Sequence, residues 1–132
     1  IIMSELKYYN EEDKDVIAKV IEIAEENGFS VDVYNNREDK EEYYFEFGKF
    51  SDCGRDFTFS IFFNTLDDIS DIADKIYEYY EDFDVSYETY IWLDNFGHGM
   101  NGAPDDMLDA YNDTKQCEGF IEELYNAIHE SC

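Results

Sequence analysis

Apolar side chains recur at helical spacing early in the chain. The run DVIAKVIEIAEENG, residues 15–28, carries apolar residues three or four positions apart and stops at Gly28, a residue suited to the position just after a helix. The apolar positions expected near one face are Val16, Val20, Ile23 and Ala24. The pattern therefore predicts an amphipathic helix that ends before Gly28.

Three runs of alternating residues follow, separated by the polar segments NNREDKEE and SDCGRD. Alternation over short segments is typical of strands with one buried face, and short turns between them favour antiparallel pairing. We therefore expect a small three-stranded antiparallel sheet whose aromatic face is covered by helices. The positions expected on that face are Phe29, Val31 and Val33, then Tyr43, Phe45 and Phe47, then Phe57, Phe59, Ile61 and Phe63.

A clear helical pattern returns in LDDISDIADKIYEYYEDF, residues 66–83. Thr65 is expected to cap this helix, with Asp68 at the capping-box position. The expected core positions are Leu66, Ile69, Ala73, Ile76, Tyr80 and Phe83.

Two further helical segments complete the chain. VSYETYIWLDN predicts a helix after Asp84, and helical spacing runs from Pro104 to the end, as one helix or as two broken near Asn112 and Asp113. The expected core positions of that last segment are Met107, Tyr111, Thr114, Cys117, Ile121, Leu124 and Ile128. The resulting order, α-β-β-β-α-α-α, predicts an α+β fold in one acidic domain over residues 1–132.

Net charge changes this picture most. The chain has 34 Asp and Glu against 9 Lys and Arg, a formal charge of −25, yet 18% aromatic residues indicate a folded domain and not a disordered acidic tail. Solubility alone needs a charge of only about 2–8 in a small domain. Adaptation to high salt is one explanation for the excess. The other is a cationic partner, since an acidic surface repels nucleic acid and anionic membranes.

The acidic residues are unevenly distributed. Residues 56–114 contain fifteen carboxylates and one base, Lys75. Five of these acids recur on the predicted helix at steps of 4, 3, 4 and 3, and we call them the carboxylate stripe: Asp67, Asp71, Asp74, Glu78 and Glu81. Like charges at this spacing destabilise a helix, and solvated faces usually mix signs. We therefore interpret the stripe as a partner-binding feature, the alternative being an ordinary solvated face.

Three acids and two aromatic residues extend the predicted binding site beyond the stripe. They are Asp82, Asp84, Glu88, Tyr77 and Tyr87. Tyrosine brings a large contact area with few rotatable bonds, and its ring accepts a stacked guanidinium group. Tyr87 is expected to lie between core and surface.

Other chemistry is poorly supported. No carboxylate pair stands out for acid–base catalysis, and DDISDIAD lacks the ligand spacing of a calcium loop. His98 and His129 do not neighbour a cysteine at zinc-ligand spacing, and GHGMNGAP lacks the phosphate-loop pattern. We therefore expect no enzyme, no metal and no cofactor. A small enzyme or metal-binding protein is kept as a third hypothesis, after the two functions given at the end of this subsection.

Cysteine usage and hydropathy bear on location. The three cysteines, Cys53, Cys117 and Cys132, are odd in number and widely spaced, which favours reduced thiols and a cytoplasmic setting. No apolar run approaches the ~18 residues that a membrane span requires.

The size, charge, aromatic content and carboxylate stripe together resemble the DNA-mimic inhibitors of phages and mobile elements, a class that includes anti-restriction and anti-CRISPR proteins with unrelated folds. GKFSDCGRDFTFSI, YYEDFDVSYETYIWLD and GHGMNGAPDDM also look like segments of small acidic proteins from mobile elements of gut bacteria. Cys53 and Arg55 depart from the turn pattern of those proteins. The resemblance implies an order of elements and an inhibitory class, with no catalytic residues.

These observations lead to one expected function and one alternative. The expected function is non-enzymatic inhibition of a bacterial defence nuclease, a CRISPR effector or a restriction–modification enzyme, by occupying its cationic nucleic-acid groove. The alternative is an immunity protein or antitoxin that neutralises a basic toxin. Either way the expected partner is a basic protein, and the chain itself is a monomer or a homodimer.

Overall fold

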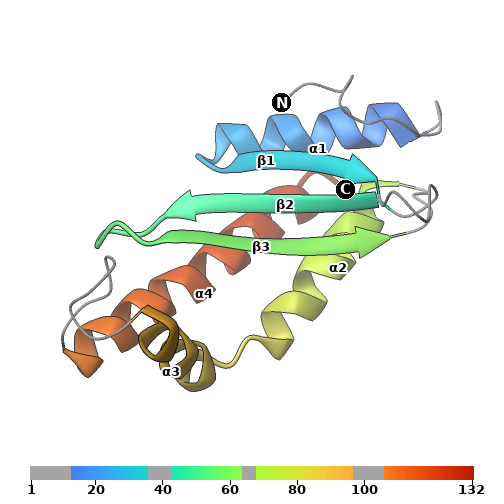
Figure 1. Cartoon of the computed structure of the whole chain (residues 1–132). Coiled ribbons are helices and arrows are strands. Elements are labelled where there is room, and N and C mark those ends of the chain that lie inside the picture. Colours follow the sequence, from blue (N-terminus) through green and yellow to red (C-terminus); the bar gives the residue numbers. More distant parts are fainter. Residues whose placement is uncertain (1–12, 36–42, 64–67, 97–105) are drawn as a thin grey trace.

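The computed structural model describes residues 13–35, 43–63, 68–96 and 106–132, and its elements follow the predicted order (Figure 1). The α+β fold with a three-stranded antiparallel sheet is confirmed. The elements are α1 (Lys14–Glu26), β1 (Ser30–Asn35), β2 (Tyr43–Phe50), β3 (Asp56–Phe63), α2 (Ile69–Asp82), α3 (Val85–Phe96) and α4 (Met107–His129).

The sheet is a meander in the order β1-β2-β3, with both neighbours antiparallel. Val33 lies opposite Phe45, which lies opposite Ile61, so one row of apolar side chains crosses all three strands. The predicted inward positions are buried in every strand, apart from Phe63, whose side chain lies outside the described residues. Full burial of one such phenylalanine stabilises the fold by about 1.5–3 kcal/mol.

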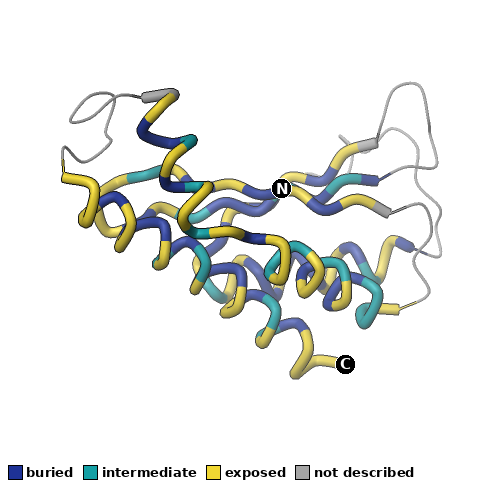
Figure 2. The backbone as a smooth tube through the Cα atoms, turned by 90° about the horizontal axis from the view of Figure 1, so that it is seen from below, coloured by how far each residue is buried: buried dark blue, intermediate teal, exposed yellow. Residues whose placement is uncertain are grey.

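Three of the helices, α1, α2 and α4, lie on one side of the sheet. In Figure 1, α2 and α4 cross behind the strands and α1 runs along β1. Figure 2 shows buried and exposed residues alternating along the strands, with α1, α2 and α4 below them and α3 rising at one end of the sheet. The core is therefore a single layer between the sheet and these helices, while α3 packs against α4 through a separate small cluster of Trp92, Leu93 and Ala110.

The end of α1 follows the predicted glycine signal. Gly28 has a φ of 84°, its N–H donates to the carbonyl of Glu25, and the N–H of Phe29 donates to the carbonyl of Ala24. This pair of hydrogen bonds satisfies the last carbonyls of the helix, and the positive φ favours glycine. The buried Phe29 then starts the chain into β1.

Two helices bury wider faces than their predicted stripes. Ile17 and Ile21 of α1 and Ile72 of α2 are buried, although the sequence pattern did not single them out. Each helix packs against more than one neighbour, so positions beside the central stripe are covered as well. Leu66 lies outside the described residues, and Ile69 is half-buried.

The last segment is one helix, α4, and not two. The predicted core positions from Thr114 onward are buried, but Met107 and Tyr111 are exposed, because the first turns of α4 extend beyond the main core to meet α3. Pro104, the expected start, lies outside the described residues, and Asp106 is the N-cap.

Candidate protein-binding surface

The start of α2 assigns a structural role to one member of the carboxylate stripe. Asp68 is the N-cap, its side chain accepts hydrogen bonds from the N–H and the hydroxyl of Ser70, and Asp71 accepts from the N–H of Asp68 at 3.3 Å. The bonds from Ser70 lower the pKa of Asp68. The cap predicted at Thr65 is thus wrong for the helix that the structure describes, which begins at Ile69; Thr65 itself lies outside the described residues.

The described members of the stripe beyond Asp71 are exposed, and a base lies beside one of them. Asp67 lies outside the described residues, and Asp74, Glu78 and Glu81 are exposed. Glu78 pairs with Lys75, the one base of residues 56–114, across 3.7 Å, so the charge of this acid is partly compensated. The pair is solvent-exposed and contributes little to stability. Asp74 and Glu81 are the stripe members whose charge is directed to solvent without a described structural role.

The acids after the stripe divide between surface and local structure. Asp82 is exposed on the last turn of α2. Asp84 accepts a hydrogen bond from the N–H of Tyr87 at 3.1 Å, which stabilises the first turn of α3. Glu88 is half-buried. The pKa of the neighbouring Tyr79 is raised mainly by the burial of its own hydroxyl and further by the charge of Glu88. Tyr87 is 58% exposed, so its expected position between core and surface is wrong.

Tyrosines of α2 line a groove against α4. The hydroxyl of Tyr80 donates to Glu122 at 2.7 Å, which raises the pKa of Tyr80 to about 12. Tyr77 packs on Tyr125 with ring centroids 5.1 Å apart and remains 45% exposed. This groove, about 490 Å³ in volume, also contains Glu81 and Glu118.

A second, smaller hollow of about 260 Å³ lies on the other side of α2, against β3. Glu78 and Asp82 line it together with Phe62 and Lys75. The structure therefore divides the predicted site: Glu81 and Tyr77 face α4, whereas Glu78 and Asp82 face the edge of the sheet. The sequence pattern missed Glu118 and Glu122; their spacing of four on the last helix was the available signal.

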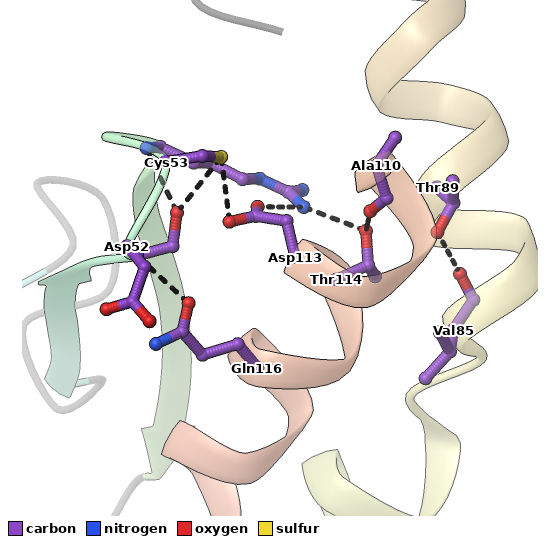
Figure 3. Close-up of polar contacts among 10 residues, drawn as sticks. Asp52, Cys53, Val85, Thr89, Ala110, Asp113, Thr114 and Gln116 are labelled. Atoms are coloured by element: carbon purple, nitrogen blue, oxygen red, sulfur yellow. Dashed lines mark hydrogen bonds and ion pairs between the residues drawn. The ribbon is translucent and has the colours of Figure 1, made fainter. Parts of the chain in front are cut away.

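One acid of the predicted acidic segment is buried. Asp113 accepts a hydrogen bond from the Cys53 thiol at 2.9 Å, and its other oxygen lies 3.9 Å from Arg55 (Figure 3). Arg55 also donates to Thr114 at 3.2 Å and lies over the Trp92 ring, 4.2 Å from its centroid. This cluster connects the β2–β3 turn to α3 and α4, and the amide of Gln116 reinforces it by accepting from the N–H of Asp52, as Figure 3 shows.

The two thiols near this cluster both have raised pKa values. Partial burial raises the pKa of Cys53, and its hydrogen bond to Asp113 raises it further. Burial raises the pKa of Cys117 to about 12. Because the thiolate is the nucleophile and metal ligand, these environments favour a structural role over a reactive one.

Within the described ranges, no group of three metal-ligating side chains occurs, and no helix there has the length and apolar character of a membrane span. No protein-family model matches the chain, and neither a curated protein nor a solved structure matches it significantly.

Proposed function

We propose that this chain is a non-enzymatic inhibitor that mimics DNA and occupies the cationic groove of a bacterial defence nuclease. The observation that carries the proposal is the net charge of −25 together with the exposed carboxylates on both sides of α2. Neighbouring members of the stripe are separated by roughly 5–6 Å along the helix axis, which is of the order of the distance between phosphates of one strand. Carboxylates so arranged replace phosphates opposite lysine and arginine side chains.

Electrostatics also accounts for how such an inhibitor reaches its target. A strongly acidic protein and a cationic groove attract each other over a distance set by ionic strength, so association is fast and weakens with salt. The target class places the inhibitor in the cytoplasm, where the reduced thiols of Cys53, Cys117 and Cys132 belong.

Charge reversal on α2 tests the proposal. The variant Asp74→Lys, Glu81→Lys, Asp82→Lys changes three exposed acids, and two of the new cations lie in the last turn of the helix, where they are favourable. Asp71 is left intact because it completes the capping box. The matched control, Glu22→Lys, Glu26→Lys, Glu130→Lys, makes the same charge change at exposed positions near the ends of α1 and α4.

The assay is DNA cleavage by a panel of CRISPR effectors and restriction enzymes, with lysate pull-downs at low and high salt to identify further targets. We expect the wild type and the control variant to inhibit a member of the panel and the α2 variant to lose at least tenfold in potency. Recovery of no nucleic-acid-binding protein, together with no inhibition in the panel, contradicts the proposal.

The second candidate is an immunity protein or antitoxin against one basic toxin. It is favoured by the exposed aromatic side chains, which give a more specific interface than charge alone. A single captured partner with toxin activity, and no effect on the nuclease panel, selects this candidate.

A further inference from the structure

The side of the sheet away from the helices carries a row of aromatic rings. Tyr34 lies opposite Tyr44 and Tyr44 opposite Phe62, so the row crosses all three strands. The Tyr34 and Tyr44 rings stack with centroids 5.2 Å apart, and those of Tyr44 and Phe62 are 6.0 Å apart. Tyr34 is 42% exposed and Phe62 is 56% exposed. Tyr44, between them, is half-buried. We call these three residues the open aromatic row; neighbouring exposed aromatic residues of this kind often mark an interaction site.

Carboxylates border the open aromatic row on two sides. Along the strands, the next outward-facing row contains Asp32 opposite Glu46. Across the edge of β3, the hollow described above joins Phe62 to Glu78 and Asp82 of α2. The aromatic surface is therefore continuous with part of the carboxylate stripe.

No described helix covers this row: α1, α2 and α4 lie on the other side of the sheet, and α3 lies toward its opposite end (Figures 1 and 2). The charge and the aromatic character of this surface indicate which kind of partner can bind to it. Two copies of a chain with a charge of −25 repel each other, as do this chain and nucleic acid or an anionic membrane. A cation above an aromatic ring and beside a carboxylate is attracted by both.

The protein binds its own cations in this manner. Lys49 Nζ lies 4.8 Å from the Phe29 ring centroid and 3.2 Å from Glu123. In the same way, the Arg55 guanidinium lies over the Trp92 ring and beside the Asp113 carboxylate. On the open aromatic row, Lys75 lies 6.0 Å above the Phe62 ring and is partly exposed, so an incoming cation competes with it.

We propose that the open aromatic row is the docking surface for arginine side chains of a basic protein partner, with guanidinium groups stacked on the rings and paired with the bordering carboxylates. Arginine suits this surface better than lysine because its planar group stacks and donates several hydrogen bonds at once. This inference rests on the proposed function in that the partner is the same basic protein; it adds that the sheet, and not α2 alone, makes the contact.

The test measures binding of labelled nine-arginine and nine-lysine peptides by fluorescence anisotropy at physiological salt. Phe62→Thr removes one ring and keeps a good strand former, and Tyr90→Ala removes a similarly exposed ring, 61% exposed, from α3. We expect the nine-arginine peptide to bind the wild type more tightly than nine-lysine, and Phe62→Thr to weaken nine-arginine binding about tenfold. Tyr90→Ala is expected to leave it unchanged.

A second pair of variants tests the competition by Lys75. Lys75→Gln and Lys115→Gln remove the same charge, and each lysine lies 6.0 Å from an aromatic ring, Phe62 and Tyr111 respectively. We expect Lys75→Gln to strengthen nine-arginine binding more than Lys115→Gln does. Circular dichroism melts confirm that each variant is folded.

Three outcomes overturn the inference: equal effects of Phe62→Thr and Tyr90→Ala, equal effects of the two lysine variants, or a wild-type dimer in sedimentation that Phe62→Thr dissociates. The last outcome assigns the row to a second copy of the chain. If the inference fails while charge reversal on α2 still abolishes nuclease inhibition, the proposed function stands without it. If Phe62→Thr selectively weakens nine-arginine binding and no nuclease is inhibited, the surface stands and the proposed function fails.

Discussion

Arg55 shows how much one residue can connect in this fold. Its guanidinium group contacts an acid and a hydroxyl of α4 and the indole of α3, while its backbone belongs to the β2–β3 turn. Its side chain is 14% exposed and that of Asp113 is 4% exposed, so the pair is shielded from water. Removing one partner of a shielded pair leaves the other charge buried and uncompensated.

We therefore expect Arg55→Ala to lower the free energy of unfolding by about 2–3 kcal/mol. Urea denaturation followed by fluorescence measures the loss, and Trp92, the only tryptophan, reports directly from the contact. The double variant Arg55→Met, Asp113→Leu should recover part of the loss, because no isolated charge remains. A single variant as stable as the wild type contradicts the role assigned to Arg55.

The pairing of Arg55 with Asp113 was beyond sequence reasoning. Asp113 lies in the same acidic segment as several exposed acids, and its hydrogen-bond partner Cys53 is 60 residues away in the sequence. Asp113 directly precedes Thr114, which is buried. The cation that pairs with Asp113 is Arg55, which reaches it only because the β2–β3 turn packs on α4. Charge counts along a chain cannot distinguish an acid in solvent from one paired across the fold.

At the scale of elements, the first turn of α2 depends on acids that also contribute to the charged surface. Asp68 and Asp71 satisfy the first N–H groups of the helix, whereas Asp74 lies mid-helix and exposed. These acids therefore differ in what their removal does, although they look alike in the sequence.

Asp68→Ala should lower the unfolding midpoint by a few degrees, because an N-cap acceptor is lost. Asp74→Ala is the control and should be neutral or stabilising, since it relieves repulsion and adds a strong helix former. Thermal melts at one ionic strength compare the two. Because hydrogen bonds lower the pKa of Asp68, its contribution is present above the unfolded-state pKa and is lost as pH falls through the folded-state value.

The Tyr80–Glu122 hydrogen bond joins α2 to α4 and makes the stability of the fold depend on pH in the alkaline range. Its donor has a pKa raised from 10.0 to about 12, so the bond stabilises the fold fully below pH 10 and is lost as pH rises toward 12. We expect the wild type to lose stability over this range more steeply than Tyr80→Phe. Urea melts at rising pH, with tyrosinate absorbance, measure this; Tyr90→Phe should behave as the wild type.

Element order was predictable because each element carries its own period. Alternation in 43–47 and 57–61 and the three–four spacing around Ile76 reflect one-sided burial, which local sequence records directly. Helix ends were less predictable: Thr65 and Asp68 are both good caps, and the choice depends on the path of the chain from β3. Likewise, the division of the stripe into two sides depends on how α2 sits between β3 and α4.

The whole molecule carries a charge that opposes its own folding. With a net charge of −25, mutual repulsion among surface acids is larger in the compact state than in the unfolded chain. Salt reduces this repulsion, since the screening length falls from about 30 Å at 0.01 M to about 3 Å at 1 M.

We therefore expect the unfolding temperature to rise by several degrees between low and high sodium chloride concentration, as measured by calorimetry. The variant Glu22→Lys, Glu26→Lys, Glu130→Lys is less negative and should show a smaller rise. An unfolding temperature that falls with added salt contradicts a fold limited by self-repulsion.

The position of α4 in the chain has a consequence for biosynthesis. This helix contacts α1, α2 and α3 and contributes Cys117, Ile121, Leu124 and Ile128 to the core, yet it is translated after the other six described elements. While α4 is still within the ribosome, the inner aromatic face of the sheet lacks a large part of its cover. Stable folding therefore waits until residues 107–129 have emerged, and chaperones that bind apolar segments have their opportunity in that interval.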